Sequence, residues 1–199
     1  MCGVSGSLRP VGELDNTVAV ITGAARGQGR SHAVALAEQG ADVIGVDICA
    51  DVAAIPYPLA NKDDLDETAR LVTATGRRFV PVVADVRNLA ELEAGIAAAI
   101  DEVGDIDIVV ANAGVVAIGN REPHAQDVYT AIVETNLNGV WHTILATVPS
   151  IIRKGRGGFH WMLSAIYGMD SAVYGEHPPY TPWDGGRAAQ PIIRRRWFT

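Results

Sequence analysis

Short apolar runs alternate with longer amphipathic segments along most of this chain. The runs at 18–21, 43–47, 79–85, 106–111 and 159–164 are rich in β-branched residues, which favour strands. The segments at 29–39, 92–103 and 127–152, and another that starts at 64, repeat apolar residues at helical spacing. Nearly continuous apolar strands that alternate with helices predict a parallel sheet covered on both faces. We therefore predict a doubly wound α/β fold with three layers, α/β/α.

Two stretches depart from this pattern. Residues 48–63 contain Pro56 and Pro58 among turn-forming residues, which predicts an extended loop or insertion. Beyond about residue 174 the chain has four prolines, no amphipathic period and a terminal arginine run, from which a core helix cannot be built. We predict a flexible arm at 1–15, one α/β domain at 16–170 and an irregular tail at 171–199.

The composition is that of an ordinary globular protein. With 199 residues, 48% of them hydrophobic and 20% charged, the chain suits one domain with a single core. A formal net charge of −7 opposes binding to phosphate backbones, so we expect no nucleic-acid partner. Cys2 and Cys49 lack the spacing of metal ligands, so we expect no metal site. No apolar run approaches the roughly 20 residues of a membrane helix, and the N-terminus lacks a signal peptide's apolar core. We expect a cytoplasmic protein without a membrane partner.

A glycine-rich turn follows the first predicted strand. In the sequence TGAARGQG, Gly23, Gly27 and Gly29 lie between a strand and a helix, and Arg26 and Gln28 stand among them. Missing β-carbons allow the backbone to approach a pyrophosphate at the helix N-terminus, where the helix dipole favours negative charge. The alternative is a tight strand-to-helix turn without a ligand. The strand-turn-helix context favours a Rossmann-type dinucleotide site.

Asp47 closes the second predicted strand, where a carboxylate can accept hydrogen bonds from both hydroxyls of an adenosine ribose. The same charge repels the 2'-phosphate of NADP, whereas Arg26 could pair with it. Ile48 follows Asp47 and supplies no cation, so the sequence favours NAD over NADP. A solvated loop carboxylate is the other interpretation of Asp47.

These features resemble the short-chain dehydrogenase/reductase family in order and spacing. The resemblance rests on TGAARGQG, Asp47, the pair Asp85 and Val86, the NAG sequence at 112–114 and Asn136, and it covers about 16–168. Within the family, GAARGQGRSHA, VDIC, YPLANKDDLDETARLV and VVANAG are similar to the carveol dehydrogenase type, grouped with mycofactocin-associated oxidoreductases. The resemblance implies a tightly held nicotinamide cofactor covered by residues 48–63.

The same resemblance implies roles for further residues. Asp85 would accept a hydrogen bond from the adenine amino group beside the Val86 backbone. The sheet edge near the adenine ribose would be shaped by Asn112, Ala113 and Gly114. Asn136 matches an asparagine that helps to hold a water for proton relay, but a purely structural hydrogen bond would equally explain an asparagine within a helix.

The reaction implied is hydride exchange between NAD and a carbinol or carbonyl carbon. It uses a tyrosine as proton carrier, a lysine four residues later and a serine that polarises the substrate oxygen. The family spacing puts Ala165 at the serine position, and a one-residue bulge would restore Ser164. Tyr180 stands near the tyrosine position, but its fourth neighbour is Asp184, which disfavours tyrosinate, and no lysine follows Lys154. Tyr180 is either the catalytic tyrosine or a loop residue among prolines.

Family members continue beyond this point with the tyrosine-lysine helix and two further strands. We therefore predict a chain truncated after the fifth strand, and a shifted reading frame near codons 172–180 is a hypothesis that translation of the other two frames would test. The usual dimer helix would be missing, although a homo-oligomer stays possible. Two functions remain open: an NAD-dependent dehydrogenase acting on a small apolar secondary alcohol or its ketone, and a noncatalytic NAD-binding protein.

Overall fold

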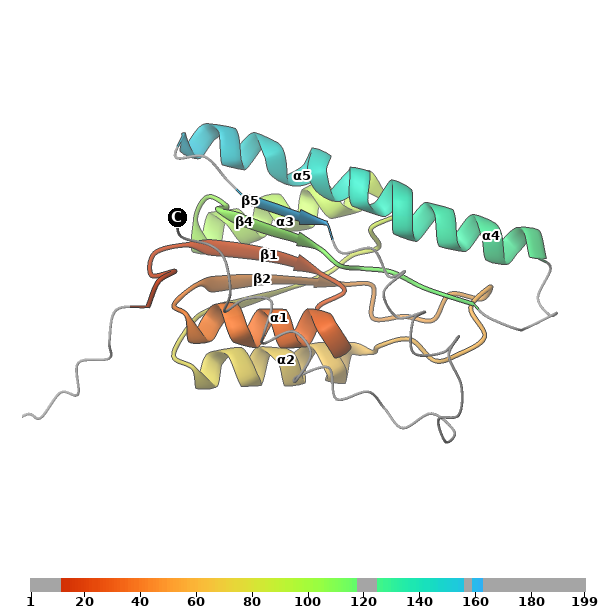
Figure 1. The fold of residues 1–199 in the computed structure, drawn as a ribbon, viewed down its shortest axis with the longest axis horizontal. Coiled ribbons are helices and arrows are strands. Elements are labelled where there is room, and N and C mark those ends of the chain that lie inside the picture. Colours follow the sequence, from red (N-terminus) through yellow and green to blue (C-terminus); the bar gives the residue numbers. More distant parts are fainter. Residues whose placement is uncertain (1–11, 118–124, 156–158, 163–199) are drawn as a thin grey trace, which may run out of the picture.

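Five parallel strands form one sheet between two layers of helices (Figure 1). The computed structural model describes residues 12–117 and 125–155, together with the backbone of 159–162. The strands are β1 (Val18–Thr22), β2 (Asp42–Asp47), β3 (Phe79–Val83), β4 (Ile108–Ala111) and β5 (Phe159–Met162). The helices are α1 (Gly27–Glu38), α2 (Lys62–Ala74), α3 (Leu89–Val103), α4 (Ala125–Val133) and α5 (Gly139–Lys154). The predicted doubly wound α/β fold is confirmed.

The strand order is β3-β2-β1-β4-β5, and every pair is parallel. The chain moves outward from β1 through β2 to β3, then returns to place β4 on the other side of β1. Register confirms the central position of β1, because Ile21 pairs with Gly45 of β2 and with Val110 of β4. The order reverses between β1 and β4, and ligands of such sheets bind at that reversal, beyond the carboxyl ends of the strands.

Two apolar clusters, one on each face of the sheet, hold the layers together. The cluster under α1 and α2 includes Ile21, Leu36 and Leu65, and the cluster under α3 and α5 includes Leu92 and Ile96. Figure 1 shows α1 and α2 on one side of the sheet and α3 and α5 on the other. Each strand of the sheet centre is buried on both faces, which is why its sequence lacks a polar alternation.

Asparagine side chains cap the N-termini of two helices, and a glycine ends a third. Asn61 caps α2 through a reciprocal capping box with Asp64, and Asn88 caps α3 by accepting from the amide of Glu91. α5 ends at Gly155 in the left-handed conformation, after Arg153 and Lys154 in the last turn. These signals fix where α2 and α3 begin and where α5 ends.

Three local predictions were wrong. The predicted helix at 127–152 is interrupted, because Glu134–Asn138 forms a π-helical turn between α4 and α5. The third strand ends at Val83, so Asp85 lies in the turn beyond it, and the fourth strand begins only at Ile108. Residues 12–15, at the end of the predicted arm, form a turn in which the Leu14 amide donates to the Gln39 carbonyl at 2.9 Å.

Candidate functional site

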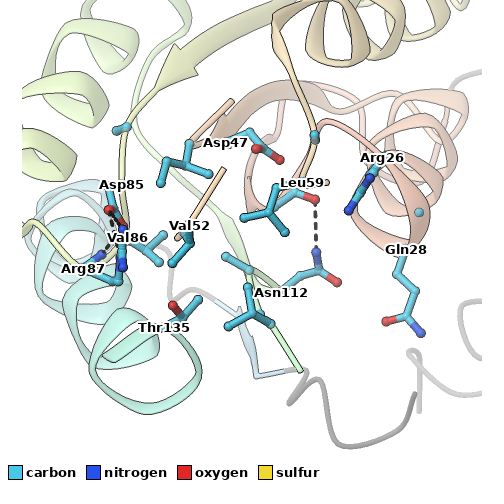
Figure 2. A pocket seen from close by; sticks show the side chains of 18 residues that line it. Arg26, Gln28, Asp47, Val52, Leu59, Asp85, Val86, Arg87, Asn112 and Thr135 are labelled. Atoms are coloured by element: carbon cyan, nitrogen blue, oxygen red, sulfur yellow. Dashed lines mark hydrogen bonds and ion pairs between the residues drawn. The ribbon is translucent and has the colours of Figure 1, made fainter. Parts of the chain in front are cut away.

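A cavity of about 310 Å³ opens at the carboxyl edge of the sheet, beside the reversal of strand order. It collects the predicted cofactor-binding residues from four separate turns. Apart from Gly29, all of them line it: Gly23, Arg26, Gly27, Gln28, Asp47, Ile48, Asp85, Val86, Asn112, Ala113 and Gly114. Figure 2 shows Asp85 at one end of this pocket, Arg26 and Gln28 at the other, and Asp47 between them.

The glycine turn needs its glycines for two different reasons. Gly23 has a φ of +68°, and a Cβ there would lie 2.9 Å from the Cα of Ala113. A Cβ on Gly29 would lie 1.9 Å from the carbonyl oxygen of Gly23, so α1 packs directly on the turn. Above Gly27 a Cβ would meet nothing within 4 Å, because that residue faces the open pocket. Gly29 therefore shapes the site without lining it.

The ends of β1 and β4 are joined behind the pocket by Thr22 and Asn112. The Thr22 hydroxyl oxygen accepts from the backbone amides of Asn112 and Ala113, each at 3.1 Å. In return the Asn112 side-chain amide donates to the carbonyls of Thr22 at 2.9 Å and Gly23 at 3.3 Å. These hydrogen bonds hold the glycine turn, residues 23–29, against the NAG turn, residues 112–114. Sequence reasoning missed Thr22, although a buried threonine at a strand end was a signal for such a contact.

Asp47 is buried, with 8% of its surface exposed, and its carboxylate organises the backbone around the pocket. One oxygen accepts from the Ala25 amide at 3.0 Å and the other from the Cys49 amide at 3.1 Å. A carboxylate offers about four acceptor directions, so roughly two remain for a ligand. The interpretation of Asp47 as a solvated loop residue is wrong.

Asp85 and Val86 occupy a turn that is fixed from two sides. Arg87 forms a forked ion pair with the Asp85 carboxylate, with its Nη2 at 2.6 Å. Burial raises the pKa of Asp85, but the hydrogen bonds and the charge of Arg87 outweigh it and lower that pKa below its usual value. From α5, the Nδ1 of His142 lies 2.8 Å from the Val86 carbonyl oxygen, which can only accept.

The connection between β2 and α2, residues 48–61, forms one wall of the pocket. It has no helix or strand, as predicted, yet it is well packed: Ile55 is buried against Val115 and Ala131. The Tyr57 hydroxyl accepts from the Val116 amide at 3.1 Å, which ties the connection to the loop after β4. Its pocket-lining side chains, which sequence reasoning did not single out, are Val52, Leu59 and Ala60.

Arg26 links this wall to the glycine turn. Its Nη2 donates to the Pro58 carbonyl at 2.9 Å, so the guanidinium is turned toward the β2–α2 connection. In Figure 2 the side chain stands at the end of the pocket opposite Asp85. The contact gives Arg26 a partner other than a 2'-phosphate.

Asn136 lies in the π-helical turn and bonds with the loop after β4 through both ends of its amide. Its oxygen accepts from the Val115 amide at 2.9 Å, and its nitrogen donates to the Val115 carbonyl at 3.0 Å. The structural explanation of this asparagine therefore has a definite partner. Its part in proton relay stays a prediction.

The other predicted catalytic residues, Ser164 and Tyr180, lie outside the described residues, as do Ala165 and Asp184. Sequence reasoning also missed Arg87 and the buried Thr135, which both line the pocket. Within the described ranges, no group of three or more His, Cys, Asp or Glu side chains is arranged to hold a metal ion. No helix in the same ranges is long and apolar enough to cross a membrane.

Comparison with known proteins agrees with this geometry. The family model for short chain dehydrogenases matches residues 17–166. A (−)-trans-carveol dehydrogenase of Rhodococcus erythropolis is 45% identical over 157 residues, which cover 78% of this chain and 57% of that protein. An uncharacterized NAD-dependent oxidoreductase of Mycobacterium tuberculosis is 42% identical over 167 residues, covering 83% of this chain and 61% of the relative.

Solved structures give the same result. The carveol dehydrogenase of Mycobacterium avium in complex with NAD has a TM-score of 0.73 and 41% identity, covering 84% of this chain and 59% of that one. A short chain dehydrogenase of Mycobacterium paratuberculosis bound to NAD has a TM-score of 0.74 and 43% identity. The match covers 79% of this chain and 59% of that one. The chain thus spans about three fifths of the length of these proteins. By sequence and by fold, the chain belongs to the short-chain dehydrogenase family.

Proposed function

We propose that the chain binds NAD in the pocket at the carboxyl edge of the sheet, as part of a dehydrogenase that interconverts a small apolar secondary alcohol and its ketone. One observation carries the proposal: residues from four turns, selected by their position after strands, line a single cavity. The relatives whose structures contain NAD support the cofactor. The relatives named carveol dehydrogenase support a cyclic, apolar alcohol as the substrate class.

The pocket's chemistry fits the three parts of the ADP half of NAD. The open space above Gly27, at the N-terminus of α1, suits a pyrophosphate. The unfilled acceptor directions of Asp47 suit two ribose hydroxyls, and its charge opposes a 2'-phosphate. Asp85 and the Val86 backbone, at the far end, suit the edge of an adenine ring.

The wall formed by residues 48–61 supports tight binding. Val52 and Leu59 present apolar surface to the pocket, and the Arg26–Pro58 and Tyr57–Val116 hydrogen bonds hold that wall in place. Bound NAD would supply a hydride acceptor at its nicotinamide ring. The wall would keep water away from the dinucleotide and slow its release.

Calorimetric titration of the full 199-residue chain with NAD and NADP tests this proposal. We expect the chain to bind NAD more tightly than NADP. Asp47→Asn should lower the NAD affinity, because the ribose hydroxyls lose a charged acceptor. It should also reduce the preference for NAD over NADP, because the charge that repels the 2'-phosphate is lost. Asp101→Asn, which removes an exposed carboxylate from α3, should change neither affinity. A wild-type chain that binds neither nucleotide would disprove the proposal.

Incubation with NAD and secondary alcohols then separates the two functions left open by the sequence. Absorbance of reduced NAD that rises with a cyclic alcohol supports a dehydrogenase, whereas binding without reduction selects the noncatalytic NAD-binding protein.

The catalytic assignments of Ser164 and Tyr180, the cytoplasmic location and a homo-oligomeric state stay predictions. Replacement of Tyr180 by Phe should abolish reduction and leave NAD binding unchanged if that tyrosine carries the proton.

A further inference from the structure

Arg87 is a charged residue of the pocket to which neither the family motifs nor the cofactor-binding predictions give a role. It follows Asp85 by two positions in the turn that leads from β3 to α3, and the Asn88 amide closes that turn by donating to the Asp85 carbonyl at 2.9 Å. The turn brings the two side chains together at the end of the pocket beside Val86 and Thr135 (Figure 2).

The contact between them is a fork rather than a single bond. The Arg87 Nε lies 3.0 and 2.9 Å from the two Asp85 carboxylate oxygens, and Nη2 lies 2.6 Å from one of them. The Arg87 backbone amide donates to the other oxygen at 2.9 Å. A guanidinium that grips both oxygens fixes the plane of the carboxylate, which a point charge cannot do.

The number of N–H groups that Arg87 donates to the Asp85 carboxylate limits what else this carboxylate can bind. Arg87 supplies three N–H groups, whereas a carboxylate has about four acceptor directions. One direction is therefore left, and an ionised carboxylate can use it only to accept. The side chains are partly buried, with 21% of Asp85 and 30% of Arg87 exposed, so water competes weakly for that direction.

The backbone beside Asp85 is held equally firmly. His142 of α5 donates to the Val86 carbonyl, and a Cβ on Gly139 would lie 2.6 Å from a Val86 methyl group, so α5 packs closely on this turn. The short segment from Asp85 to Arg87 is thus held by its own hydrogen bonds and by α5. Such rigidity is needed to distinguish ligands by one hydrogen bond, because a mobile carboxylate would turn away from a second acceptor and avoid the repulsion.

We propose that Arg87 is a positioning residue that makes the pocket selective for a purine with an exocyclic 6-amino group over one with a 6-oxo group. The inference rests on the proposed function, since it assigns the adenine end of the NAD site. The fork leaves Asp85 one acceptor direction, which an amino hydrogen satisfies. A 6-oxo oxygen in the same place would face a carboxylate oxygen, and the two acceptors repel each other.

Calorimetry with two ligands tests the proposal on the full chain: NAD, and nicotinamide hypoxanthine dinucleotide, which carries the 6-oxo group. We expect the wild type to prefer NAD by roughly tenfold or more, the value of one hydrogen bond to a charged group. Arg87→Met should weaken NAD binding roughly tenfold and leave the 6-oxo analogue within about twofold. Arg87→Lys, which keeps the charge but loses the fork, should retain only part of the preference.

A matched control is available on α2. Arg70 makes a forked ion pair with Glu67 through Nε and Nη2, both at 2.7 Å, away from the pocket. Arg70→Met should therefore leave both affinities unchanged. Asp85→Asn should already abolish the preference for NAD over the 6-oxo analogue. The double variant with Arg87→Met should therefore show the same lack of preference as Asp85→Asn alone.

The possible failures are distinguishable. A wild-type chain that binds neither ligand overturns the proposed function and this inference with it. If the wild type binds NAD but Arg87→Met weakens both ligands equally, Arg87 supports the pocket without selecting the base, and the inference alone is overturned. It is also overturned if Arg87→Met tightens NAD binding, because Arg87 would then be a competitor of adenine for Asp85.

Discussion

Replacement of Gly23 by alanine should destabilise the fold through two separable effects. The first is backbone strain, because Gly23 has a φ of +68° and an L-residue there costs about 1–2 kcal/mol. The second is overpacking: the new Cβ would lie 2.9 Å from both the Cα of Ala113 and the Nδ2 of Asn112, and displacing backbone in a packed region costs about 1–3 kcal/mol. Together these effects predict a loss of about 2–5 kcal/mol.

Gly155 provides a control for the first effect alone. It has the same φ of +68°, but a Cβ there would meet nothing within 4 Å. Gly155→Ala should therefore cost about 1–2 kcal/mol, and the smaller entropy of the unfolded chain that alanine brings is common to both variants and cancels. The difference between the variants isolates the close approach of the glycine turn to the NAG turn.

Urea unfolding followed by circular dichroism measures both losses, and thermal unfolding should show a shift of about 2–4 °C for each kcal/mol. Gly23→Ala should also weaken NAD binding, because the glycine turn must move to relieve the contact. If Gly23→Ala costs no more than Gly155→Ala, the contact between the glycine turn and the NAG turn is not tight, and the overpacking effect at Gly23 is refuted.

Two further predictions concern side chains that join distant elements. Asp42 is 5% exposed and pairs with Arg77 at 2.9 Å and Arg78 at 2.6 Å, so Asp42→Asn should cost about 2 kcal/mol in urea unfolding at neutral pH, as expected for hydrogen bonds to a charged group. Burial raises the pKa of Asp42, but hydrogen bonds from Arg78 and both arginine charges lower it below its usual value. The stabilisation is thus full above the unfolded pKa of about 4 and lost as the pH falls through the lower folded value, so the two unfolding curves should converge in acid; a constant gap would contradict this. Asn136→Ala removes both hydrogen bonds to the buried Val115 and should cost about 2 kcal/mol, whereas a loss below about 0.5 kcal/mol would show that water replaces the amide.

Much of the site could be predicted because of how parallel sheets are built. The chain returns to the same edge after every strand, so residues that directly follow strands gather there whatever the strand order. Asp47, Asp85 and Asn112 could therefore be grouped before any contact was known, and all three line the pocket. The apolar runs and the amphipathic segments predicted the layers for a similar reason, since both patterns depend on neighbours in the chain.

Contacts between segments that are remote in the chain could not be predicted. Hydrophobic periodicity reports which face of an element is buried, but it does not identify the partner on the other side. Asn136 shows this: its position in the sequence suited a structural or a catalytic role equally, and only the fold supplied Val115 as its partner. The hydrogen bond between Tyr57 and Val116 is another contact between remote segments that the sequence does not reveal.

Sequence alone was enough to predict the α/β alternation, the glycine turn and the carboxylates at or just after strand ends, because each depends on local periodicity and on residue types within a few positions. The order β3-β2-β1-β4-β5, the π-helical turn and the fork of Arg87 on Asp85 became known only from the folded chain. These features depend on how helices and strands dock, and on which of several nearby partners a long side chain reaches. Docking is a property of surfaces in three dimensions, to which residues far apart in the chain contribute together.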